Sequence, residues 1–349
     1  MSERIGVALS GGADSALAAS LLLSQGQPVF ALHLLLVRGS AAEEQARRAA
    51  DVARKLGIQL EVIDAVDAFA DHVIAPFCAE YASGRTPNPC VTCNRHIKFG
   101  LLLDVALQCG ADRLATGHYA RIARGAGGYT LLRAADHQAD QSYFLYAVDP
   151  SALERLLFPL GELFRSDVRA LAAGQHLARG RSSQDICFVA GRDYGRFVAD
   201  RVATEPGDIV DTLGRLQGRH RGLPFYTVGQ RHRLGVTLGQ PAYVVHLAPQ
   251  RNEVVIGTRD DLLCAGARLD AVRWLAQPRE TQFRAQARIR FRARSCTADV
   301  AVGAGSAVVT FEEPQRAVAP GQSLVLYDGD TVLGGGVVDA AWTSKHDAE

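Results

Sequence analysis

Residues 4–17 read RIGVALSGGADSAL, and the turn at the centre of this stretch sets the fold that follows. An apolar run leads into Gly11 and Gly12, after which a helix is expected over about 15–24. Because glycine takes positive φ without a Cβ clash, successive backbone N–H groups can converge there on an anion. The positive end of the following helix points at the same place. The stretch therefore predicts a phosphate-binding loop.

Polar side chains in this loop suit a nucleotide. Asp14 offers carboxylate oxygens, which Mg²⁺ prefers, and such an ion would bridge phosphates. Ser10 and Ser15 add hydroxyl donors. The loop is not of the Walker type, because no Gly-Lys-Ser/Thr follows. A strand–turn–helix that uses small residues only for close packing is the alternative interpretation.

The bulk composition sets few limits on function. The chain has 349 residues, is 48% hydrophobic and carries a formal net charge of +1, which fits two or three domains. This charge neither requires nor excludes a nucleic-acid partner. Among 38 basic residues the lysines are only Lys55, Lys98 and Lys345.

We expect a cytoplasmic protein with no membrane association. Residues 1–4 lead straight into a strand, and no apolar run approaches the ~20 residues that span a bilayer. The seven cysteines are an odd number, which favours reduced thiols over a disulfide framework.

Strands and helices alternate along the first part of the chain. The expected strands are 29–37, 59–63 and 113–116, and the expected helices are 41–56, 69–80, 99–109, 151–157 and 167–176. This order predicts a parallel sheet with right-handed crossovers. Ligands of such sheets bind beyond the carboxyl ends of the strands. We therefore expect the loops after Leu9, Leu34 and Thr116 to share one rim.

Composition changes near residue 203, where Gly, Pro and short β-like runs become frequent. We expect an α/β catalytic domain over 1–200, a small β-rich domain over 201–266, and an antiparallel β-barrel over 267–349.

A Cys-x-x-Cys segment lies within the proline-rich stretch 84–94, which is expected to be a loop. Three interpretations are open: half of a zinc site, a thioredoxin-like dithiol, or a thiol that works with a distant cysteine. Arg95, His96 and a nearby helix N-terminus are expected to lower the pKa of the thiol of Cys93. The distant partner is expected to be Cys187, although a Cys between Ile and Phe is often a core residue.

Further polar residues follow the expected strand at 113–116. Gly117 permits close approach of a nucleotide, and His118 follows at the rim. Residues 140–145 read DQSYFL, and Asp140 could simply cap a helix.

Five arginines fall on one side of a two-residue repeat late in the chain: Arg284, Arg288, Arg290, Arg292 and Arg294. Small or apolar residues alternate with them, which predicts a half-buried strand with a row of exposed guanidinium groups. Such a row is either a charged sheet edge or a surface that follows RNA phosphates.

Taken together, the motifs resemble the tRNA-specific 2-thiouridylases, a family within the ATP-pyrophosphatase superfamily. The resemblance covers nearly the whole chain in family order and rests on SGGADS, GRTPNPCVTCNRHIKFG, ATGHYAR, DQSYFL, FPLGELFRSDVR, SSQDICF, YTVGQRHRLG and PGQSLVLYDGD. It implies thiolation at C2 of the wobble uridine in tRNAs for Lys, Glu and Gln. It also implies ATP and Mg²⁺ as cofactors, and a cysteine desulfurase or sulfur-relay protein as donor.

The resemblance also implies roles for individual residues. Cys187 matches the cysteine that receives persulfide sulfur, and Cys93 matches the second catalytic cysteine. The implied ATP-binding residues are Ala8, Leu9, Ser10, Gly11, Gly12, Ala13, Asp14, Ser15, Leu34 and Gly117. The implied tRNA-binding positions are Asn88, Pro89, Cys90, His118, Ala139, Asp140, Gln141, Arg290, Phe291 and Gln322. No dedicated metal-ligating residues are implied.

Three positions depart from the family pattern. Ala139 replaces a common lysine, Arg233 stands where glycine is usual, and Cys90 replaces an aspartate. With Cys93 and Cys187, the extra thiol could hold an iron–sulfur cluster that supplies sulfide in place of a persulfide.

Two further hypotheses stay open: a different ATP-pyrophosphatase, such as a synthetase, and a non-catalytic sulfur carrier or tRNA-binding protein.

Overall fold

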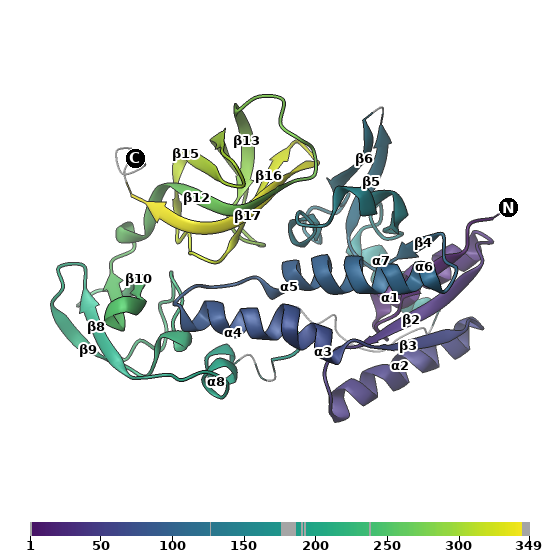
Figure 1. The fold of residues 1–349 in the computed structure, drawn as a ribbon, viewed down its shortest axis with the longest axis horizontal. Coiled ribbons are helices and arrows are strands. Elements are labelled where there is room, and N and C mark those ends of the chain that lie inside the picture. Colours follow the sequence, from purple (N-terminus) through teal and green to yellow (C-terminus); the bar gives the residue numbers. More distant parts are fainter. Residues whose placement is uncertain are drawn as a thin grey trace.

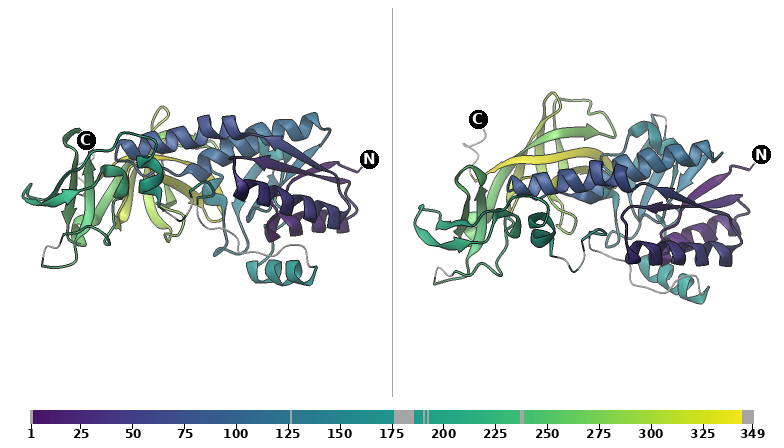
Figure 2. Two further views of the ribbon diagram at one scale, coloured as in Figure 1. Left: turned by 90° about the horizontal axis from the view of Figure 1, so that it is seen from below. Right: turned by 60° about the horizontal axis from the view of Figure 1, so that its bottom comes forward.

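The computed structural model describes residues 2–125, 127–175, 186–189, 191, 193–236 and 239–343. Figure 1 shows an elongated molecule with the N-terminal sheet at one end and β8 to β10 at the other. The yellow-green barrel lies between them above two long helical runs. The two further views show the same arrangement, with the helical runs extending along the molecule from the N-terminal sheet toward the other end (Figure 2).

The N-terminal sheet has five parallel strands in the order β3-β2-β1-β4-β7, which confirms the expected α/β fold. These are β1 Ile5–Ala8, β2 Val29–Leu35, β3 Leu60–Asp64, β4 Arg113–Ala115 and β7 Leu156–Leu157. The associated helices are α1 Ala13–Ser24, α2 Ser40–Leu56 and α7 Arg165–Gly174. The strand order reverses between β1 and β4. In sheets of this kind ligands bind at such a reversal, so we expect the ligand site at the carboxyl ends of these two strands.

Two helical runs connect this sheet to the rest of the molecule. The first comprises α3 Val66–Phe69, the π-helical η1 Ala70–Ile74 and α4 Ala75–Ala82. The second comprises α5 Pro89–Thr92, the π-helical η2 Cys93–Leu101 and α6 Leu102–Gln108.

The expected loop over 84–94 and the expected helix start at Phe99 were wrong. The helix begins at Pro89, because proline fits the first helical position, where its missing N–H costs no hydrogen bond. Cys90 and Cys93 therefore lie on a helix.

The region after β4 differs from the expectation in two further places. A β-hairpin, β5 Ala120–Gly125 and β6 Gly128–Arg133, was not expected. The helix expected at 151–157 is the 3₁₀ turn η4 Pro150–Arg155 followed by β7. The remaining elements here are η3 Ser142–Phe144 and α8 Tyr194–Ala199. Residue 176, the expected end of α7, lies outside the described residues.

The middle of the chain forms a small sheet in the order β10-β11-β8-β9. Its strands are β8 Gly207–Asp211, β9 Leu216–His220, β10 Tyr243–Ala248 and β11 Glu253–Gly257. Short 3₁₀ turns occur at η6 Leu223–Phe225, η7 Pro249–Arg251 and η8 Asp260–Leu262. Ile209, Val244, Val254 and Ile256 are fully buried and form its core.

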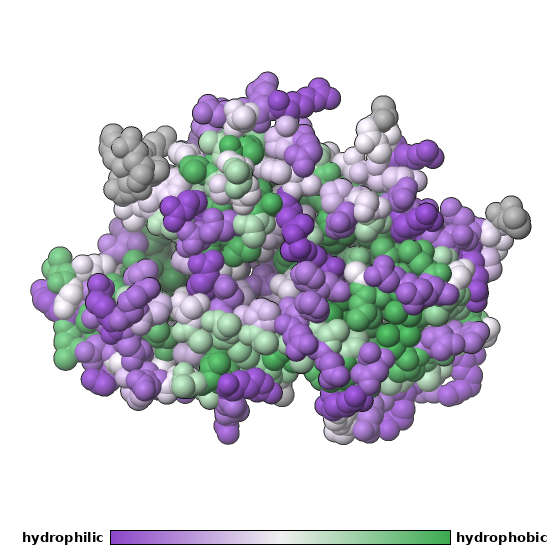
Figure 3. Space-filling view, viewed as in Figure 1, coloured by the Kyte–Doolittle hydropathy of each residue, from purple (hydrophilic) through white to green (hydrophobic). Residues whose placement is uncertain are grey.

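The C-terminal strands form a barrel, as expected, which the antiparallel pairing of β12 with β17 closes. Its strands are β12 Leu263–Trp274, β13 Gln282–Arg288, β14 Cys296–Val302, β15 Ala307–Arg316, β16 Ser323–Asp328 and β17 Thr331–Trp342. The hairpin strand β6 joins the same sheet through the pairing of Leu132 with Thr331. Figure 3 shows hydrophilic side chains crossing the middle of this face, where the barrel meets the N-terminal part.

The strand expected over 284–294 was wrong, because β13 ends at Arg288 and the chain then forms a bend and a turn. The expected exposure holds for Arg284, Arg290, Arg292 and Arg294 but not for Arg288. Arg284 is exposed and bonds Glu312 at 2.8 Å. The side chain of Arg288 is only 12% exposed and donates to Asp140 at 3.0 Å, on a segment far away in sequence.

The buried Asp140–Arg288 pair ties the sheet domain to the barrel. Asp140 is 1% exposed, and Oδ1 also accepts hydrogen bonds from the backbone N–H groups of Ala134 and Ser142 at 3.1 Å each. One hydrophobic core runs beneath the pair, since Tyr143 of the sheet domain and Tyr327 of the barrel belong to the same buried cluster.

We predict that Asp140→Ala lowers the free energy of unfolding by about 3–5 kcal/mol, because it leaves the Arg288 charge buried without its partner. Urea unfolding at neutral pH measures this loss. Glu312→Ala is the matched control: it breaks the exposed pair with Arg284 and should change stability little. Equal losses in the two variants would contradict the assignment.

Arg233 adopts φ +62°, the left-handed region that glycine occupies without strain. This backbone conformation suits the glycine that the resemblance led us to expect at this position. We predict that Arg233→Gly raises the free energy of unfolding by about 0.5–1 kcal/mol, since relief of strain outweighs the extra freedom of glycine in the unfolded chain. A lower melting temperature in this variant would refute the prediction.

Candidate active site at the carboxyl ends of the parallel strands

The predicted phosphate loop runs from the end of β1 into the first turn of α1. Four hydrogen bonds connect its small residues: Ser15 Oγ accepts from Ser10 N at 3.1 Å and donates to Gly12 O at 3.1 Å, the Ser10 and Ser15 hydroxyls are 3.0 Å apart, and Gly12 N donates to Ser10 Oγ at 3.3 Å. Gly11 has φ +77°, and a Cβ there would lie 2.9 Å from Ala49 N. The loop therefore has one tightly fixed shape.

The loop after β4 packs directly on this turn. A Cβ on Gly117 would lie 2.9 Å from the backbone of both Asp14 and Ser15, so only glycine allows the approach. Two residues later, the hydroxyl of Tyr119 donates to Asp14 Oδ1 at 3.1 Å, which orients the carboxylate. The expectation that the β1 and β4 loops share one rim is confirmed. Leu34, at the end of β2, is half-buried against both the central core and the cluster that contains Cys93.

The sequence-distant cysteines lie close together. Cys93 is buried on η2, whereas Cys90 and Cys187 keep exposed surface. Cys187 raises the pKa of both Cys90 and Cys93 electrostatically, so the three sulfurs lie within range of one another. Phe188 packs edge-on against Phe69 at 5.5 Å, in the same cluster as Cys93. This contact holds the Cys187 segment against the helices.

All three thiols are free. Residues 182–185, which precede Cys187 in its motif, lie outside the described residues.

The expectation of a lowered pKa for the Cys93 thiol was wrong. Burial raises the pKa of Cys93 to about 12. Protein packed around the other two sulfurs also raises the pKa values of Cys90 and Cys187. Arg95 and His96, which were expected to act on Cys93, line a groove whose lining includes none of the three cysteines.

Lys98 is the cation that acts on the thiols, and it was not among the predicted site residues. It lowers the pKa of Cys90, Cys93 and Cys187 against the effect of burial. In an α-helix, residues five apart point about 140° away from each other. The i→i+5 bonding of a π-helix instead brings Cys93 and Lys98 toward the same side. The scarcity of lysine was the only sequence signal that singled out Lys98.

His118 follows Gly117, which packs on the phosphate loop, and is within electrostatic range of Lys98. Its Nδ1 is 2.7 Å from Thr116 Oγ1, and its ring contacts the rings of Phe99 and Phe158. Burial and Lys98 lower the pKa of His118 well below its usual value, so the ring is neutral at pH 7.

The predicted tRNA-binding positions fall into two groups. The first group lies at the start of the cysteine helix: Pro89 is its first residue, Cys90 is exposed, and Asn88 hydrogen-bonds Tyr143. Gln322 of the barrel donates to Thr86 O at 2.8 Å and so holds the segment that leads into this helix.

The second group lies where the sheet domain meets the barrel. Ala139 and Asp140 are buried, and Gln141 Oε1 accepts a hydrogen bond from Tyr119 N at 2.9 Å. Phe291 packs against Phe144 with ring centroids 4.3 Å apart, whereas Arg290 is exposed. Most of this group already makes contacts within the protein.

The described residues contain neither a clustered metal site nor a membrane-spanning helix. Nowhere among them do three or more His, Cys, Asp or Glu side chains gather as a metal site would require. Cys90, Cys93 and Cys187 are all described, so in this arrangement they do not fit an iron–sulfur cluster. No helix in the described parts has both the length and the apolar character of a membrane span.

The fold and the phosphate loop define a nucleotide-binding α/β enzyme domain followed by two β domains. Three family models match the chain in this order: "tRNA methyl transferase HUP domain" over 3–191, "tRNA methyl transferase PRC-barrel domain" over 195–258, and "Aminomethyltransferase beta-barrel domain" over 265–338.

Full-length relatives identify the family. The chain is 41% identical over 341 residues to the tRNA-specific 2-thiouridylase MnmA of Syntrophomonas wolfei, covering 96% of this chain and 99% of the relative. It is 44% identical over 345 residues to the protein of the same name from Desulforudis audaxviator, with 97% and 98% covered. A third such relative, from Pelobacter propionicus, is 43% identical over 99% of both chains. The chain belongs to the tRNA-specific 2-thiouridylase family, whose nucleotide-binding domain implies the use of ATP.

We predict that Lys98→Met raises the pKa of the Cys187 thiol, because the nearby positive charge that favours the thiolate is lost. At fixed pH below that pKa, the alkylation rate of Cys187 should fall roughly tenfold for each unit that the pKa rises. Peptide-level mass spectrometry after iodoacetamide treatment over pH 7–10 measures this rate.

Two variants control this experiment. Lys98→Arg keeps the positive charge and should restore most of the rate. Lys55→Met removes a lysine from α2, remote from the cysteines, and should leave the rate unchanged. An unchanged alkylation profile in Lys98→Met would show that Lys98 does not act on the thiol.

Proposed function

We propose that this chain is a tRNA-uridine 2-sulfurtransferase that consumes ATP and transfers sulfur from Cys187 to C2 of the wobble uridine. The observation that carries this proposal is that Cys187 and Lys98, distant in sequence, both act electrostatically on Cys93 of the helix that begins at Pro89. The identity with 2-thiouridylases over nearly the full length supports it.

In the first step the target oxygen becomes a leaving group. The uridine O2 attacks the α-phosphorus of ATP, the bond to the β-phosphate oxygen breaks, pyrophosphate leaves, and the N3 proton passes to solvent. Residues 8–15 form the phosphate site, with the backbone N–H groups in the first turn of α1 directed at the phosphates, and Leu34 and Gly117 flank the adenosine. The tight fit of Gly117 against Asp14 and Ser15 supports this placement.

Asp14 would hold the Mg²⁺ of the nucleotide. Its Oδ1 accepts from Tyr119, and Oδ2 has no hydrogen-bond partner among the described residues, which leaves one hard oxygen for a cation. When bound, the ion neutralises charge on the phosphates. Tyr119 keeps the carboxylate oriented toward the loop.

In the second step the sulfur moves. The terminal sulfur of a persulfide on Cys187 attacks C2, and the C2–O bond breaks as AMP leaves. The Cys93 thiolate then attacks Sγ of Cys187, the S–S bond breaks, and the thiouridine sulfur leaves while N3 regains a proton. A Cys93–Cys187 disulfide results, and a thiol reductant supplies two electrons to restore both thiols. A cysteine desulfurase or sulfur-relay protein supplies the persulfide sulfur.

The tRNA reaches this site with its wobble base out of the anticodon stack, because C2 is otherwise inaccessible. Asn88, Pro89 and Cys90 receive the base at the start of the cysteine helix. His118, Ala139, Asp140, Gln141, Arg290, Phe291 and Gln322 form the surrounding tRNA-binding surface. The acceptors are tRNAs for Lys, Glu and Gln.

We predict that Cys93→Ser and Cys187→Ser each reduce wobble 2-thiouridine at least about 100-fold, since each removes a sulfur that the transfer step requires. The measurement is mass spectrometry of tRNA nucleosides from a deletion strain complemented with each variant. tRNA-dependent release of pyrophosphate should persist for one turnover in both variants, whereas AMP should be released by Cys93→Ser, which keeps the persulfide-bearing Cys187, but not by Cys187→Ser.

Cys109→Ser is the matched control, because Cys109 is an exposed free thiol at the end of α6, and it should behave as wild type. Full activity of both catalytic variants would favour an ATP-pyrophosphatase that needs no thiol. Absence of pyrophosphate release from the wild type would favour a sulfur carrier.

A further inference from the structure

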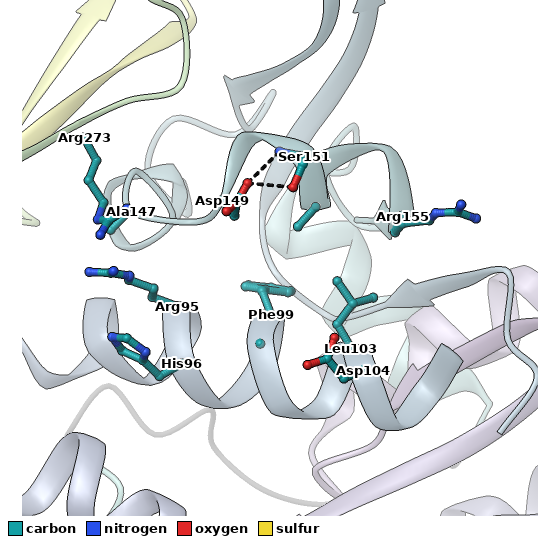
Figure 4. Close-up of a pocket in the computed structure, with 12 residues that line it drawn as sticks. Arg95, His96, Phe99, Leu103, Asp104, Ala147, Asp149, Ser151, Arg155 and Arg273 are labelled. Carbon is teal, nitrogen blue, oxygen red and sulfur yellow. Dashed lines mark hydrogen bonds between the residues drawn. The ribbon is translucent and has the colours of Figure 1, made fainter. Parts of the chain in front are cut away.

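A polar groove lies on the cysteine helix but away from the thiols. It has a volume of about 440 Å³, and its lining includes Arg95 and Phe99 of η2, Asp149 and Ser151 at the start of η4, and Arg273 of β12. Figure 4 shows the guanidinium groups of Arg95 and Arg273 facing each other across the groove, one from the helix and one from the barrel. The groove is therefore built by two domains.

The groove carries more positive charge than the protein neutralises. Among the described residues neither arginine side chain makes a hydrogen bond or an ion pair. Burial lowers the pKa of Arg95, and like-charge repulsion from Arg273 lowers it further. The Asp149 carboxylate attracts both arginines from a distance but makes no hydrogen bond to either. It instead accepts hydrogen bonds from Ser151 N at 2.9 Å and from Ser151 Oγ at 2.7 Å. Two facing guanidinium groups whose N–H donors have no partner in the described chain form a site for an anion.

The backbone of β12 is deformed where it presents Arg273. The pairing register with β17 shifts between Asp270 and Arg273, and Ala271 takes φ +50°, a conformation that non-glycine residues rarely adopt. Bulges of this kind re-aim a side chain and occur near functional sites. Here the bulge immediately precedes the arginine that faces Arg95.

The geometry points to a phosphate group as the ligand, and we propose that the Arg95–Arg273 groove binds a phosphodiester of the tRNA backbone. The planar fork of each guanidinium matches two phosphate oxygens, and arginine from both sides would clamp one phosphate. Arg95 lies on the same helix as Cys93 but lines a groove that contains none of the cysteines, so this phosphate would belong to a part of the tRNA other than the nucleotide that enters the thiol site. The ATP phosphates have their own loop at residues 8–15. This inference rests on the proposed tRNA substrate.

The test compares Arg95→Gln, Arg273→Gln and the double variant in tRNA binding by fluorescence anisotropy at several salt concentrations. Each single variant should weaken binding roughly tenfold. Since both side chains bind one phosphate, the double variant should lose much less than the product of the single losses. The slope of log K against log salt should become shallower by about 0.7–0.9 in the double variant. Arg54→Gln on α2, an exposed arginine paired with Asp51, is the control and should bind as wild type.

Each outcome has a defined meaning. The phosphate proposal is refuted if the double variant binds tRNA with unchanged affinity and salt slope. The proposed function still holds in that case, provided that the wild type thiolates tRNA. The phosphate proposal is also refuted if the double variant binds ATP or inorganic phosphate more weakly but binds tRNA unchanged, because the ligand of the groove would then be a small anion. Failure of the wild type to bind tRNA refutes the proposed function itself. Equal melting temperatures of all variants exclude a folding defect as the cause.

Discussion

The structure depends on the helix that begins at Pro89 and widens into a π-helix at Cys93. Widening changes which residues share a face, and it brings the cation that acts on the thiols, Lys98, to the side of Cys93. The opposite side carries Arg95 and Phe99 to the groove shared with the barrel. A regular α-helix of the same sequence would separate Cys93 from Lys98, so the sulfur site and the polar groove both follow from this local distortion.

The raised thiol pKa values have a chemical meaning in the resting enzyme. Cys93, with a pKa of about 12, is protonated at neutral pH, and protonated thiols are poor nucleophiles and resist oxidation. In the proposed mechanism, a Cys93 thiol that stays protonated before substrate and sulfur arrive would avoid premature disulfide formation with Cys187. Its attack in that mechanism therefore requires a change of surroundings that lowers the pKa of Cys93.

Sequence alone could predict the parts of the fold that depend on local rules. The glycine turn, the parallel strands and the C-terminal barrel were predicted correctly, because hydrophobic periodicity and turn residues determine them. The start of the cysteine helix was missed because proline is common both in loops and at the first helical position. Features of the site that arise only in three dimensions were missed as well. The partner of Arg288 is Asp140, 148 residues away, and no local pattern links them. The direction of the thiol pKa shifts was missed because the burial of Cys93 comes from packing by Phe69, Val73 and Ile97.

The hydrophobic cluster that spans the two larger domains has a consequence for how this family can diversify. Tyr143 and Leu145 of one domain share a dry interior with Val325 and Tyr327 of the other. A barrel from an unrelated RNA-binding protein could not be grafted onto this catalytic domain without rebuilding that interior. A substitution at one of these positions therefore changes the packing of residues from both halves of the chain.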